Sequence, residues 1–308
     1  MAIENILALF PGQGSQCIGM GKSFYDANPI AKELFQKADD ILKFPLSELC
    51  FNGPIEKLTS TEIVQPAILT VSTICYRCYL EKHGAETNIV AVAGHSLGEY
   101  SALVAAEAIS FEDAVLLVHK RGSYMQNAIP NGFGKMVAVL GKTEEDIEEA
   151  LGKVSDENRN KVQVANYNAP GQIVMSGLTE AVNEFLEKLG NAKTAVLAVS
   201  VPCHSQLMAP AAQKLSEVLD KLQINEAKIP VYCNVTGKAT TNPKEIRDAL
   251  NAQVCGSVQW VSCMQNAIAE KSPTLAVEFG SGSVLSNLLK RIDKNLARTS
   301  IGNVEDLS

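Results

Sequence analysis

Short apolar runs alternate with amphipathic stretches along the chain, and this alternation predicts a mixed fold of strands and helices. The runs "ENILALF" at 4–10 and "NIVAVAGH" at 88–95 are apolar almost throughout, which is typical of strands buried on both faces of a parallel sheet. The glycine-rich turn "PGQGSQ" at 11–16 is expected to lead from the first strand into a helix. Apolar residues at helical spacing predict helices over 32–43, 65–84, 96–108 and 111–129.

The pattern changes after Gly132, where short strands and amphipathic helices follow in the order β-α-β-β-α-β. This order is typical of a ferredoxin-like module. The strands are predicted at 134–141, 161–168, 171–177 and 193–200, and the helices at 143–154 and 178–190. Strand-like runs return at 230–237 and 274–280. We therefore predict a larger α/β domain formed by 1–131 and 201–308, with a smaller α+β subdomain inserted over 132–200.

Composition narrows the choice of partners and compartment. The 308 residues are 46% hydrophobic and 20% charged, which is ordinary for a globular protein with a sizeable core. The net charge of −7 argues against a nucleic-acid partner, because such proteins carry a basic surface. The N-terminus lacks the basic start of a signal peptide, and no run approaches 18 apolar residues. We therefore expect a cytoplasmic protein that has no membrane span.

Eight cysteines are scattered along the chain, and without an export signal we expect them to be reduced thiols. The only CxxC pair, Cys75 and Cys78, lies within a run predicted to be helical. No second Cys/His pair follows at the spacing of a zinc site. We interpret the two cysteines as helix-packing residues and predict no metal site.

The stretch "GHSLG" at 94–98 joins an apolar strand to an alanine-rich helix. A Gly-x-Ser-x-Gly junction in this context is the nucleophile elbow, in which small neighbours allow a tight turn with a serine at its apex. Unpaired N–H groups at the helix N-terminus can stabilise a developing oxyanion there. Ser96 is therefore a candidate nucleophile, and the alternative is an ordinary N-cap serine.

A nucleophilic Ser96 needs a base within hydrogen-bond reach, and the chain offers four histidines. Side chains of adjacent residues diverge at such a turn, so we expect His95 to pack rather than to act as the base. His83 lies at a polar helix end, and His119 lies in the middle of a helix. His204 follows the inserted module in a loop, which favours it by placement, although the residues alone leave the assignment open.

Three other features carry weaker signals. The turn at 11–16 lacks the third glycine of a dinucleotide-binding motif, because Cys17 takes its place, so we expect its N–H groups to approach an oxyanion instead. Arg121 follows an apolar helical face, where an arginine is usually solvated; the functional alternative is a clamp on a substrate carboxylate. Asn234 begins an "NVT" glycosylation match, to which we assign no role without an export signal.

A series of motifs resembles the malonyl-CoA:acyl-carrier-protein transacylase family over nearly the whole chain. The motifs are "FPGQGSQ" at 10–16, "EIVQPAI" at 62–68, "GHSLGEYSAL" at 94–103, "RGSYMQ" at 121–126, "GFGKMVAVLG" at 132–141, "ANYNAPGQIVMSG" at 165–177, "VPCHSQLM" at 201–208 and "VEFGSGSVLSNLLKR" at 277–291. The resemblance implies an α/β-hydrolase-like core with a parallel sheet and a ferredoxin-like insert. The chain departs from the family at "GSG", 280–282, where the family often has "GPG", and at Cys255 and Ser257, where it often has an aromatic residue and a proline.

The resemblance also implies catalytic roles for individual residues. Ser96 would be the acylated nucleophile, and His204 would be the base and acid that serves it. Gln253 matches a family glutamine near the histidine, which main-chain carbonyls orient in place of an aspartate. The backbone N–H groups of Gln13 and Leu97 would form the oxyanion hole.

The implied reaction moves a malonyl group from malonyl-CoA to the phosphopantetheine thiol of acyl carrier protein, through a malonyl-serine, in fatty-acid biosynthesis. Arg121 would bind the malonyl carboxylate beside Gln65, no cofactor would be needed, and the chain would act as a monomer. The alternatives are a serine hydrolase or thioesterase, a catalytically silent acyl-binding protein, and transfer of another acyl group such as methylmalonyl. Lys120, Lys135 and Lys193 are candidates for carrier docking.

Overall fold

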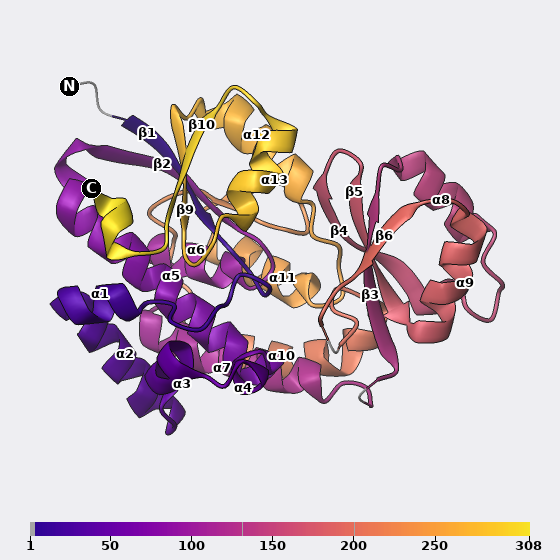
Figure 1. Cartoon of the computed structure of the whole chain (residues 1–308), viewed down its shortest axis with the longest axis horizontal. Coiled ribbons are helices and arrows are strands. Elements are labelled where there is room, and N and C mark those ends of the chain that lie inside the picture. Colours follow the sequence, from indigo (N-terminus) through magenta and orange to yellow (C-terminus); the bar gives the residue numbers. More distant parts are fainter. Residues whose placement is uncertain (1–3, 131, 200) are drawn as a thin grey trace.

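The computed structural model describes residues 4–130, 132–199 and 201–308, and it places two β-sheets side by side (Figure 1). The larger sheet has the strand order β10-β9-β1-β2-β7-β8. All of its strands run parallel except β8, which pairs antiparallel with β7. The strands are β1 (Glu4–Phe10), β2 (Thr87–Gly94), β7 (Val231–Tyr232), β8 (Ala239–Thr240), β9 (Leu275–Phe279) and β10 (Ala297–Ile301). A mixed α/β fold with a parallel sheet is thus confirmed.

Helices cover both faces of the larger sheet, as the apolar runs of its central strands predict. In β1, Ile6, Ala8 and Phe10 join a core that contains α2, α5, α6, α7 and α10, whereas Leu7 and Leu9 face α12 and α13. The helices are α1 (Lys22–Ala27), α2 (Pro29–Leu42), α3 (Leu46–Asn52), α4 (Ile55–Leu58), α5 (Thr61–His83), α6 (Gly98–Ala105), α7 (Phe111–Gln126), α10 (Ala209–Leu219), α11 (Pro243–Gln253), α12 (Trp260–Lys271) and α13 (Val284–Ile292).

The smaller sheet is antiparallel, with the order β4-β5-β3-β6. Its elements are β3 (Gly134–Leu140), α8 (Glu144–Gly152), β4 (Val162–Ala169), β5 (Gln172–Leu178), α9 (Thr179–Leu189) and β6 (Lys193–Val196), in the order that the sequence predicts. Val137 and Val139 of β3 pack with Phe185 of α9 in a separate core. Met136 and Ala138, on the opposite face of the strand, join the core of the larger sheet. The small sheet is therefore buried on one side and turned toward the rest of the chain on the other.

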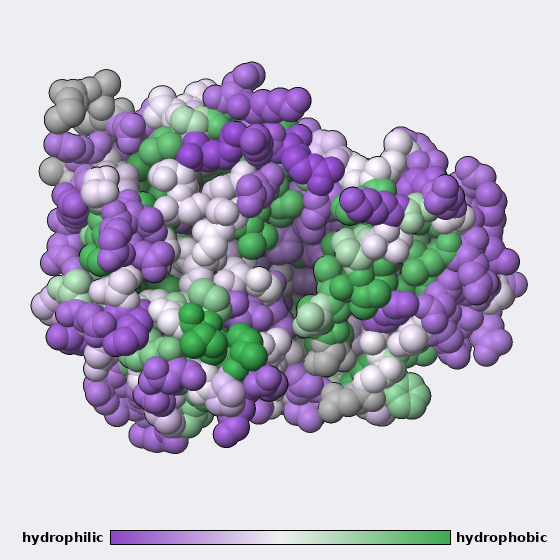
Figure 2. All heavy atoms as spheres, in the orientation of Figure 1, coloured by the Kyte–Doolittle hydropathy of each residue, from purple (hydrophilic) through white to green (hydrophobic). Residues whose placement is uncertain are grey.

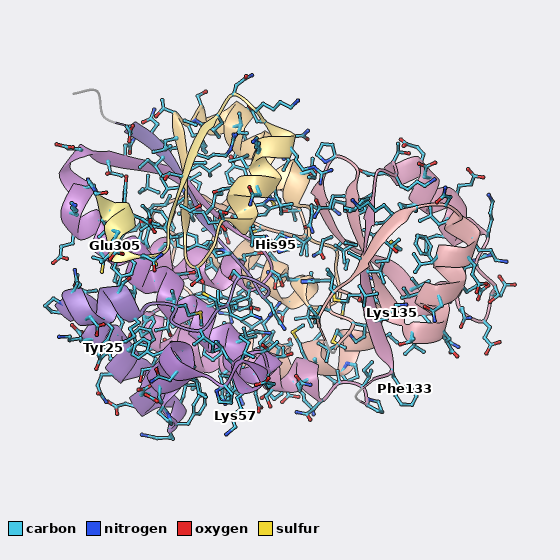
Figure 3. All side chains as sticks on the ribbon, in the orientation of Figure 1. Tyr25, Lys57, His95, Phe133, Lys135 and Glu305 are labelled. Carbon is cyan, nitrogen blue, oxygen red and sulfur yellow. The ribbon has the colours of Figure 1, made fainter. Side chains whose placement is uncertain are left out.

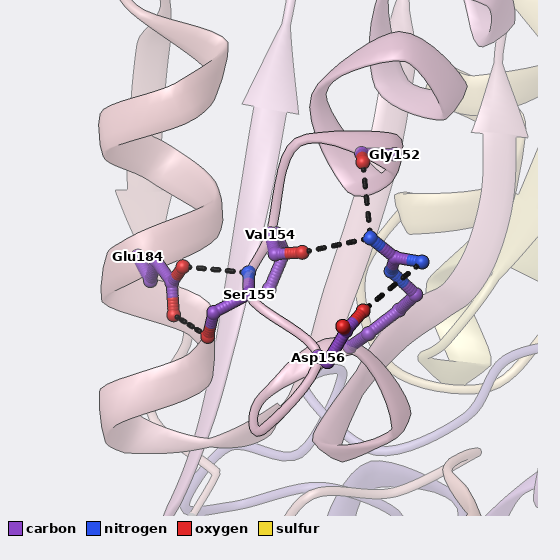
Figure 4. Close-up of polar contacts among 6 residues, drawn as sticks. Gly152, Val154, Ser155, Asp156 and Glu184 are labelled. Atoms are coloured by element: carbon purple, nitrogen blue, oxygen red, sulfur yellow. Dashed lines mark hydrogen bonds and ion pairs between the residues drawn. The ribbon is translucent and has the colours of Figure 1, made fainter.

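A polar network closes the loop between α8 and β4 (Figure 4). The Glu184 carboxylate of α9 accepts hydrogen bonds from the Ser155 backbone N–H at 2.7 Å and from its hydroxyl at 2.9 Å. The Arg159 guanidinium donates to the carbonyl oxygens of Gly152 at 3.3 Å and Val154 at 3.2 Å. The two Arg159 bonds provide partners for the carbonyl of Gly152, the last residue of α8, and for that of Val154 just after it. Carbonyls at a helix end have no partner within the helix.

Four segments differ from the sequence-based expectation. The strand expected over 193–200 is observed only as β6, and residue 200 lies outside the described residues. The turn at 11–16 does not lead into a helix at once, because left-handed glycines, among them Gly14, Gly19 and Gly21, keep the backbone irregular until α1 begins at Lys22. The strand expected over 230–237 is only the two residues of β7, since the chain then turns back to form β8. The edge strand β10 was not predicted, because its side chains alternate between exposed and partly buried instead of forming an apolar run.

Helix α5 is apolar on all sides, and other parts of the protein surround it. Within the described residues it is the one helix long and apolar enough to cross a membrane, with a mean hydropathy of 1.2 over its best window. However, 83% of that window is buried inside the protein. A helix that is apolar on all sides is typical of such a buried position as well as of a membrane.

The cysteines give a direct test of this packing. All eight thiols are free, and Cys75 and Cys78 are buried in α5, as their interpretation as packing residues requires. Burial raises the pKa of both thiols above the ordinary value, which disfavours the reactive thiolate. We expect iodoacetamide to alkylate exposed Cys17 first in the native protein, with half-buried Cys255 slower. Peptide mass mapping before and after denaturation in urea measures this order, and rapid native alkylation of the α5 pair would contradict the packing.

Candidate active site

Ser96 lies at the apex of a tight turn between β2 and α6. Its backbone φ of 52° is in the left-handed region, which residues other than glycine rarely adopt. A Cβ on Gly94 would lie 1.9 Å from the carbonyl of Gly98, and a Cβ on Gly98 would lie 1.9 Å from the Phe10 carbonyl oxygen. Both positions therefore exclude every side chain, and the predicted elbow geometry is confirmed.

The Ser96 hydroxyl lies 2.7 Å from Nε2 of His204. The other ring nitrogen, Nδ1, is 2.9 Å from the Gln253 carbonyl oxygen and 3.1 Å from that of Gly256. Carbonyl oxygens only accept, so Nδ1 must carry the proton and Nε2 accepts from the serine. Burial, aided by the positive charge of Arg121, lowers the pKa of His204 to about 3. The ring is therefore neutral at pH 7 and is oriented as a base.

The remaining histidines lie away from the hydroxyl. His95 points its Nε2 at the Asn168 side chain, at 2.7 Å, and packs edge-on against the Trp260 ring with centroids 5.5 Å apart. Figure 3 labels His95 where the larger sheet faces the smaller one. His83 and His119 bond to backbone carbonyls far from the elbow. The predicted packing role of His95 agrees with these contacts.

Arg121 of α7 is buried beside the serine, with 1% of its surface exposed. Its Nη1 donates to Gln65 Oε1 at 2.8 Å, and its Nη2 donates to Gln253 Oε1 at 3.0 Å and to Ser96 Oγ at 3.2 Å. The guanidinium also lies over the Tyr100 ring, 5.2 Å from its centroid. No carboxylate in the described part of the chain comes within 4.0 Å of it. The alternative that Arg121 is solvated is therefore wrong. Its positive charge is available to bind an anion.

We expect the backbone N–H groups of Gln13 and Leu97 to serve one oxyanion. Both residues line the same cavity as Ser96. The turn that carries Gln13 lies against the elbow, because a Cβ on Gly12 would be 2.4 Å from the His95 carbonyl oxygen. Among the residues described, neither amide has a hydrogen-bond acceptor. Two unpaired donors beside a nucleophile are what an oxyanion hole requires.

A cavity of about 220 Å³ brings these groups together. It opens at the junction of the two sheets, where Figure 2 shows a hollow bordered by apolar side chains of the smaller sheet. Six of the seven predicted site residues line it: Gln13, Gln65, Ser96, Leu97, Arg121 and His204. Gln253 lies behind the wall and acts on the others through its polar groups. In the residues described, no cluster of three His, Cys, Asp or Glu side chains is arranged to hold a metal.

The predicted docking lysines differ in exposure. Lys193 of β6 is exposed, whereas Lys120 and Lys135 are half-buried. The Lys135 ammonium donates to the Asn183 side chain at 2.6 Å, on the smaller sheet (Figure 3). Docking through these residues stays a prediction.

Asn234 is a site residue that the sequence did not identify. Its Oδ1 accepts from the Ser96 backbone N–H at 2.6 Å, and its Nδ2 donates to the Gly94 carbonyl oxygen at 2.7 Å. It is fully buried, so its glycosylation match has no access to solvent. Its place two residues after β7, at the carboxyl end of a parallel strand, was the available signal, because sites gather at that edge of a sheet.

Gln163 of β4 is a second residue that was missed. Its Nε2 donates to the carbonyl oxygens of His204 and Cys255, both at 3.0 Å, and its Oε1 accepts from the Gln206 N–H at 3.0 Å. Through Gln163, the smaller sheet ties the loop of His204 to the segment that carries Cys255. No sequence signal marks a glutamine for this role.

Comparison with known proteins gives a consistent family. The family described as an acyl transferase domain matches residues 8–302. The chain is 46% identical to the malonyl CoA-acyl carrier protein transacylase of Bacillus subtilis (strain 168), over 99% of this chain and 96% of that protein. It is 42% identical to that of Escherichia coli (strain K12), over 95% and 94%.

Solved structures agree. The malonyl CoA-acyl carrier protein transacylase of Coxiella burnetii superposes with a TM-score of 0.94 at 38% identity, over 100% of this chain and 97% of that one. A malonyl-transacylase solved in complex with a type II polyketide synthase acyl-carrier protein superposes with a TM-score of 0.93 at 38% identity, over 98% and 97%.

The close packing around the elbow predicts that an added methyl group lowers the stability of the fold at Gly94 but not at Gly152. We expect Gly94→Ala to destabilise the fold by at least about 3 kcal/mol, because the overlap with Gly98 backbone cannot relax cheaply. Gly152→Ala is the matched control, since nothing lies within 4 Å of its Cβ position at the end of α8. We expect this control to leave stability unchanged or to raise it by up to about 1 kcal/mol. Urea unfolding measures both, and equal stabilities would contradict the strained elbow.

Proposed function

The chain belongs to the family of malonyl-CoA:acyl-carrier-protein transacylases, and we propose that it transfers the malonyl group through an ester on Ser96. One observation carries this proposal. The Ser96 hydroxyl lies between a neutral base, His204, and a buried arginine that has no carboxylate partner among the described residues. A malonyl ester at Ser96 would carry its free carboxylate on the same short chain, within reach of the Arg121 guanidinium.

Acylation begins when His204 Nε2 takes the proton of the Ser96 hydroxyl as its oxygen attacks the thioester carbonyl of malonyl-CoA. The carbonyl oxygen becomes negatively charged and accepts hydrogen bonds from the N–H groups of Gln13 and Leu97. The carbon–sulfur bond then breaks, and the histidine returns the proton to the sulfur of CoA. The product of this half-reaction is a malonyl ester on the serine.

Transfer to the carrier runs the same steps in reverse order. The pantetheine thiol of acyl carrier protein gives its proton to His204, and its sulfur attacks the ester carbonyl. The same two N–H groups stabilise the second oxyanion. The ester bond to Ser96 breaks, and the histidine restores the serine hydroxyl. The base thus returns to its neutral form after each half-reaction and is ready for the next one.

We infer that this activity supplies malonyl groups to the carrier protein of fatty-acid biosynthesis. We further infer an α/β-hydrolase-like core formed by 1–131 and 201–308 with a ferredoxin-like insert over 132–200. The parallel order around β1 and β2, the elbow after β2, and the β-α-β-β-α-β order of the insert support this assignment.

The nucleophile is tested by intact mass after brief exposure to malonyl-CoA. We expect a stoichiometric malonyl adduct on the wild-type chain and none on Ser96→Ala. Adding acyl carrier protein should remove the adduct and yield malonyl carrier. Free malonate as the main product would favour the hydrolase alternative, and an unmodified wild-type chain would favour a silent acyl-binding protein.

Selectivity is tested at Arg121. Leaving a buried guanidinium unpaired costs about 3–5 kcal/mol, so an acetyl group should be disfavoured about a hundredfold or more relative to malonyl. We expect Arg121→Ala to lower kcat/KM for malonyl-CoA by about that factor while acetyl-CoA transfer is kept or rises. Arg77→Ala, at an exposed position on α5, is the matched control. Equal losses for both substrates would contradict the carboxylate clamp.

A further inference from the structure

Glu99 is a buried carboxylate that the reaction described above does not use. It lies in the first turn of α6, three residues after the nucleophile, and 1% of its surface is exposed. Its Oε2 accepts hydrogen bonds from the Asn234 backbone N–H at 3.0 Å and from Gln253 Nε2 at 2.8 Å. Carboxylates are rarely buried so completely unless they are paired, so the position calls for a partner charge.

The two residues that bind Glu99 also hold the nucleophile. The Asn234 side chain accepts the Ser96 N–H, and Gln253 Nε2 donates to the Ser96 carbonyl oxygen at 3.0 Å. Both backbone polar groups of the strained serine are therefore fixed by residues that Glu99 positions. The Gln253 main-chain carbonyl also accepts from His204.

The Gln253 amide links the carboxylate to the arginine. Its Nε2 donates to Glu99, and its Oε1 accepts from Arg121 Nη2 at 3.0 Å. These two bonds fix which way the amide faces, because only the oxygen can accept from a guanidinium. The positive charge of Arg121 and the negative charge of Glu99 are thus both buried, one amide apart, and no carboxylate in the described part of the chain pairs with the arginine directly.

In the described part of the chain, the titratable and charged groups that face Glu99 are an arginine, a tyrosine and two thiols. Arg121 faces it from α7, Tyr100 from its own helix, and the thiols of Cys233 and Cys263 from the segment after β7 and from α12. Burial raises the pKa of Glu99 to about 7, against the opposing effects of Asn234, Gln253 and Arg121. Burial raises the pKa of both thiols and of Tyr100, so these groups stay protonated.

We propose that Glu99 is a positioning residue of the malonyl site, whose carboxylate balances Arg121 through the Gln253 amide while the site is empty and takes up a proton when the malonyl carboxylate binds. The inference rests on the proposed function, since it needs a carboxylate to arrive at Arg121. That arrival places two negative charges around one arginine in a buried site, and like charges there disfavour double ionisation. In the described part of the chain, Glu99 Oε1 accepts no N–H or O–H hydrogen bond, so this oxygen can carry the proton, and the Cys233 thiol is the further hydrogen-bonding group beside the carboxylate.

The test is proton uptake on binding, measured by titration calorimetry of malonyl-CoA into Ser96→Ala in buffers of different ionisation enthalpy. We expect uptake of up to about one proton near pH 8, falling toward zero near about pH 5.5, where Glu99 is already protonated. Acetyl-CoA carries the same CoA phosphates without the carboxylate, so it should show none of this excess. Uptake that instead grows as the pH falls would assign the proton to His204 and overturn the proposal.

A second variant separates the charge from the shape. Glu99→Gln, combined with Ser96→Ala, keeps an oxygen that can accept from Asn234 and Gln253 but cannot ionise. We expect malonyl-CoA to bind this double variant without the excess uptake. Persistent uptake would overturn the inference while leaving the proposed function intact. Failure of malonyl-CoA to bind Ser96→Ala at all would overturn both. If only the double variant fails to bind, the pH series on Ser96→Ala decides the question.

Discussion

The left-handed backbone of Ser96 is the constraint on which the rest of the site depends. A serine with φ near 52° persists only when its surroundings determine it, because the conformation costs about 1–3 kcal/mol. Two kinds of contact provide this here. Gly94 and Gly98 allow backbone segments to approach more closely than any Cβ permits, and Asn234 and Gln253 bind the N–H and C=O of the serine itself. The strain is therefore held by residues from three distant parts of the sequence.

The same network that holds the Ser96 backbone also keeps the positive charge of Arg121 buried in the site. An isolated charge in a protein interior is costly, and Arg121 reduces that cost with two glutamine oxygens and the face of Tyr100 rather than with an ion pair. A direct carboxylate partner would have stabilised the arginine but would have closed it to substrate. Uncharged acceptors keep the guanidinium in place without neutralising its charge, so the guanidinium still attracts an anion.

The sequence alone identified those parts of the site that depend on residues close together in the chain. The elbow could be predicted because strand, two glycines and helix are adjacent in the chain, and the helix-packing cysteines because their spacing belongs to one helix. Neither Asn234 nor Gln163 could be found that way, since each acts on residues 40 or more positions distant through contacts that only the tertiary fold creates. The same limit applied to β10, whose pairing with β9 does not depend on an apolar run. Resemblance to a family supplied the roles of Gln13, Leu97 and Gln65, which periodicity and spacing did not.

The smaller sheet contributes one side of the cavity in which the elbow lies. Its strands and the segment after β6 contribute Met136, Val174 and Leu197 to the cavity wall, and α13 adds Leu285 and Leu288 from the opposite side. A held water needs two to four polar partners, and these five side chains offer none, whereas Asn166 and Asn168 of β4 add polar groups to the same lining. A pantetheine arm carries amides as well as methylene groups, so it can contact both kinds of side chain. Because Gln163 of β4 also binds the His204 carbonyl oxygen, the part of the cavity wall formed by the smaller sheet is joined to the loop that carries His204. How the two sheets are joined therefore determines both the lining of the cavity and the position of His204 beside it.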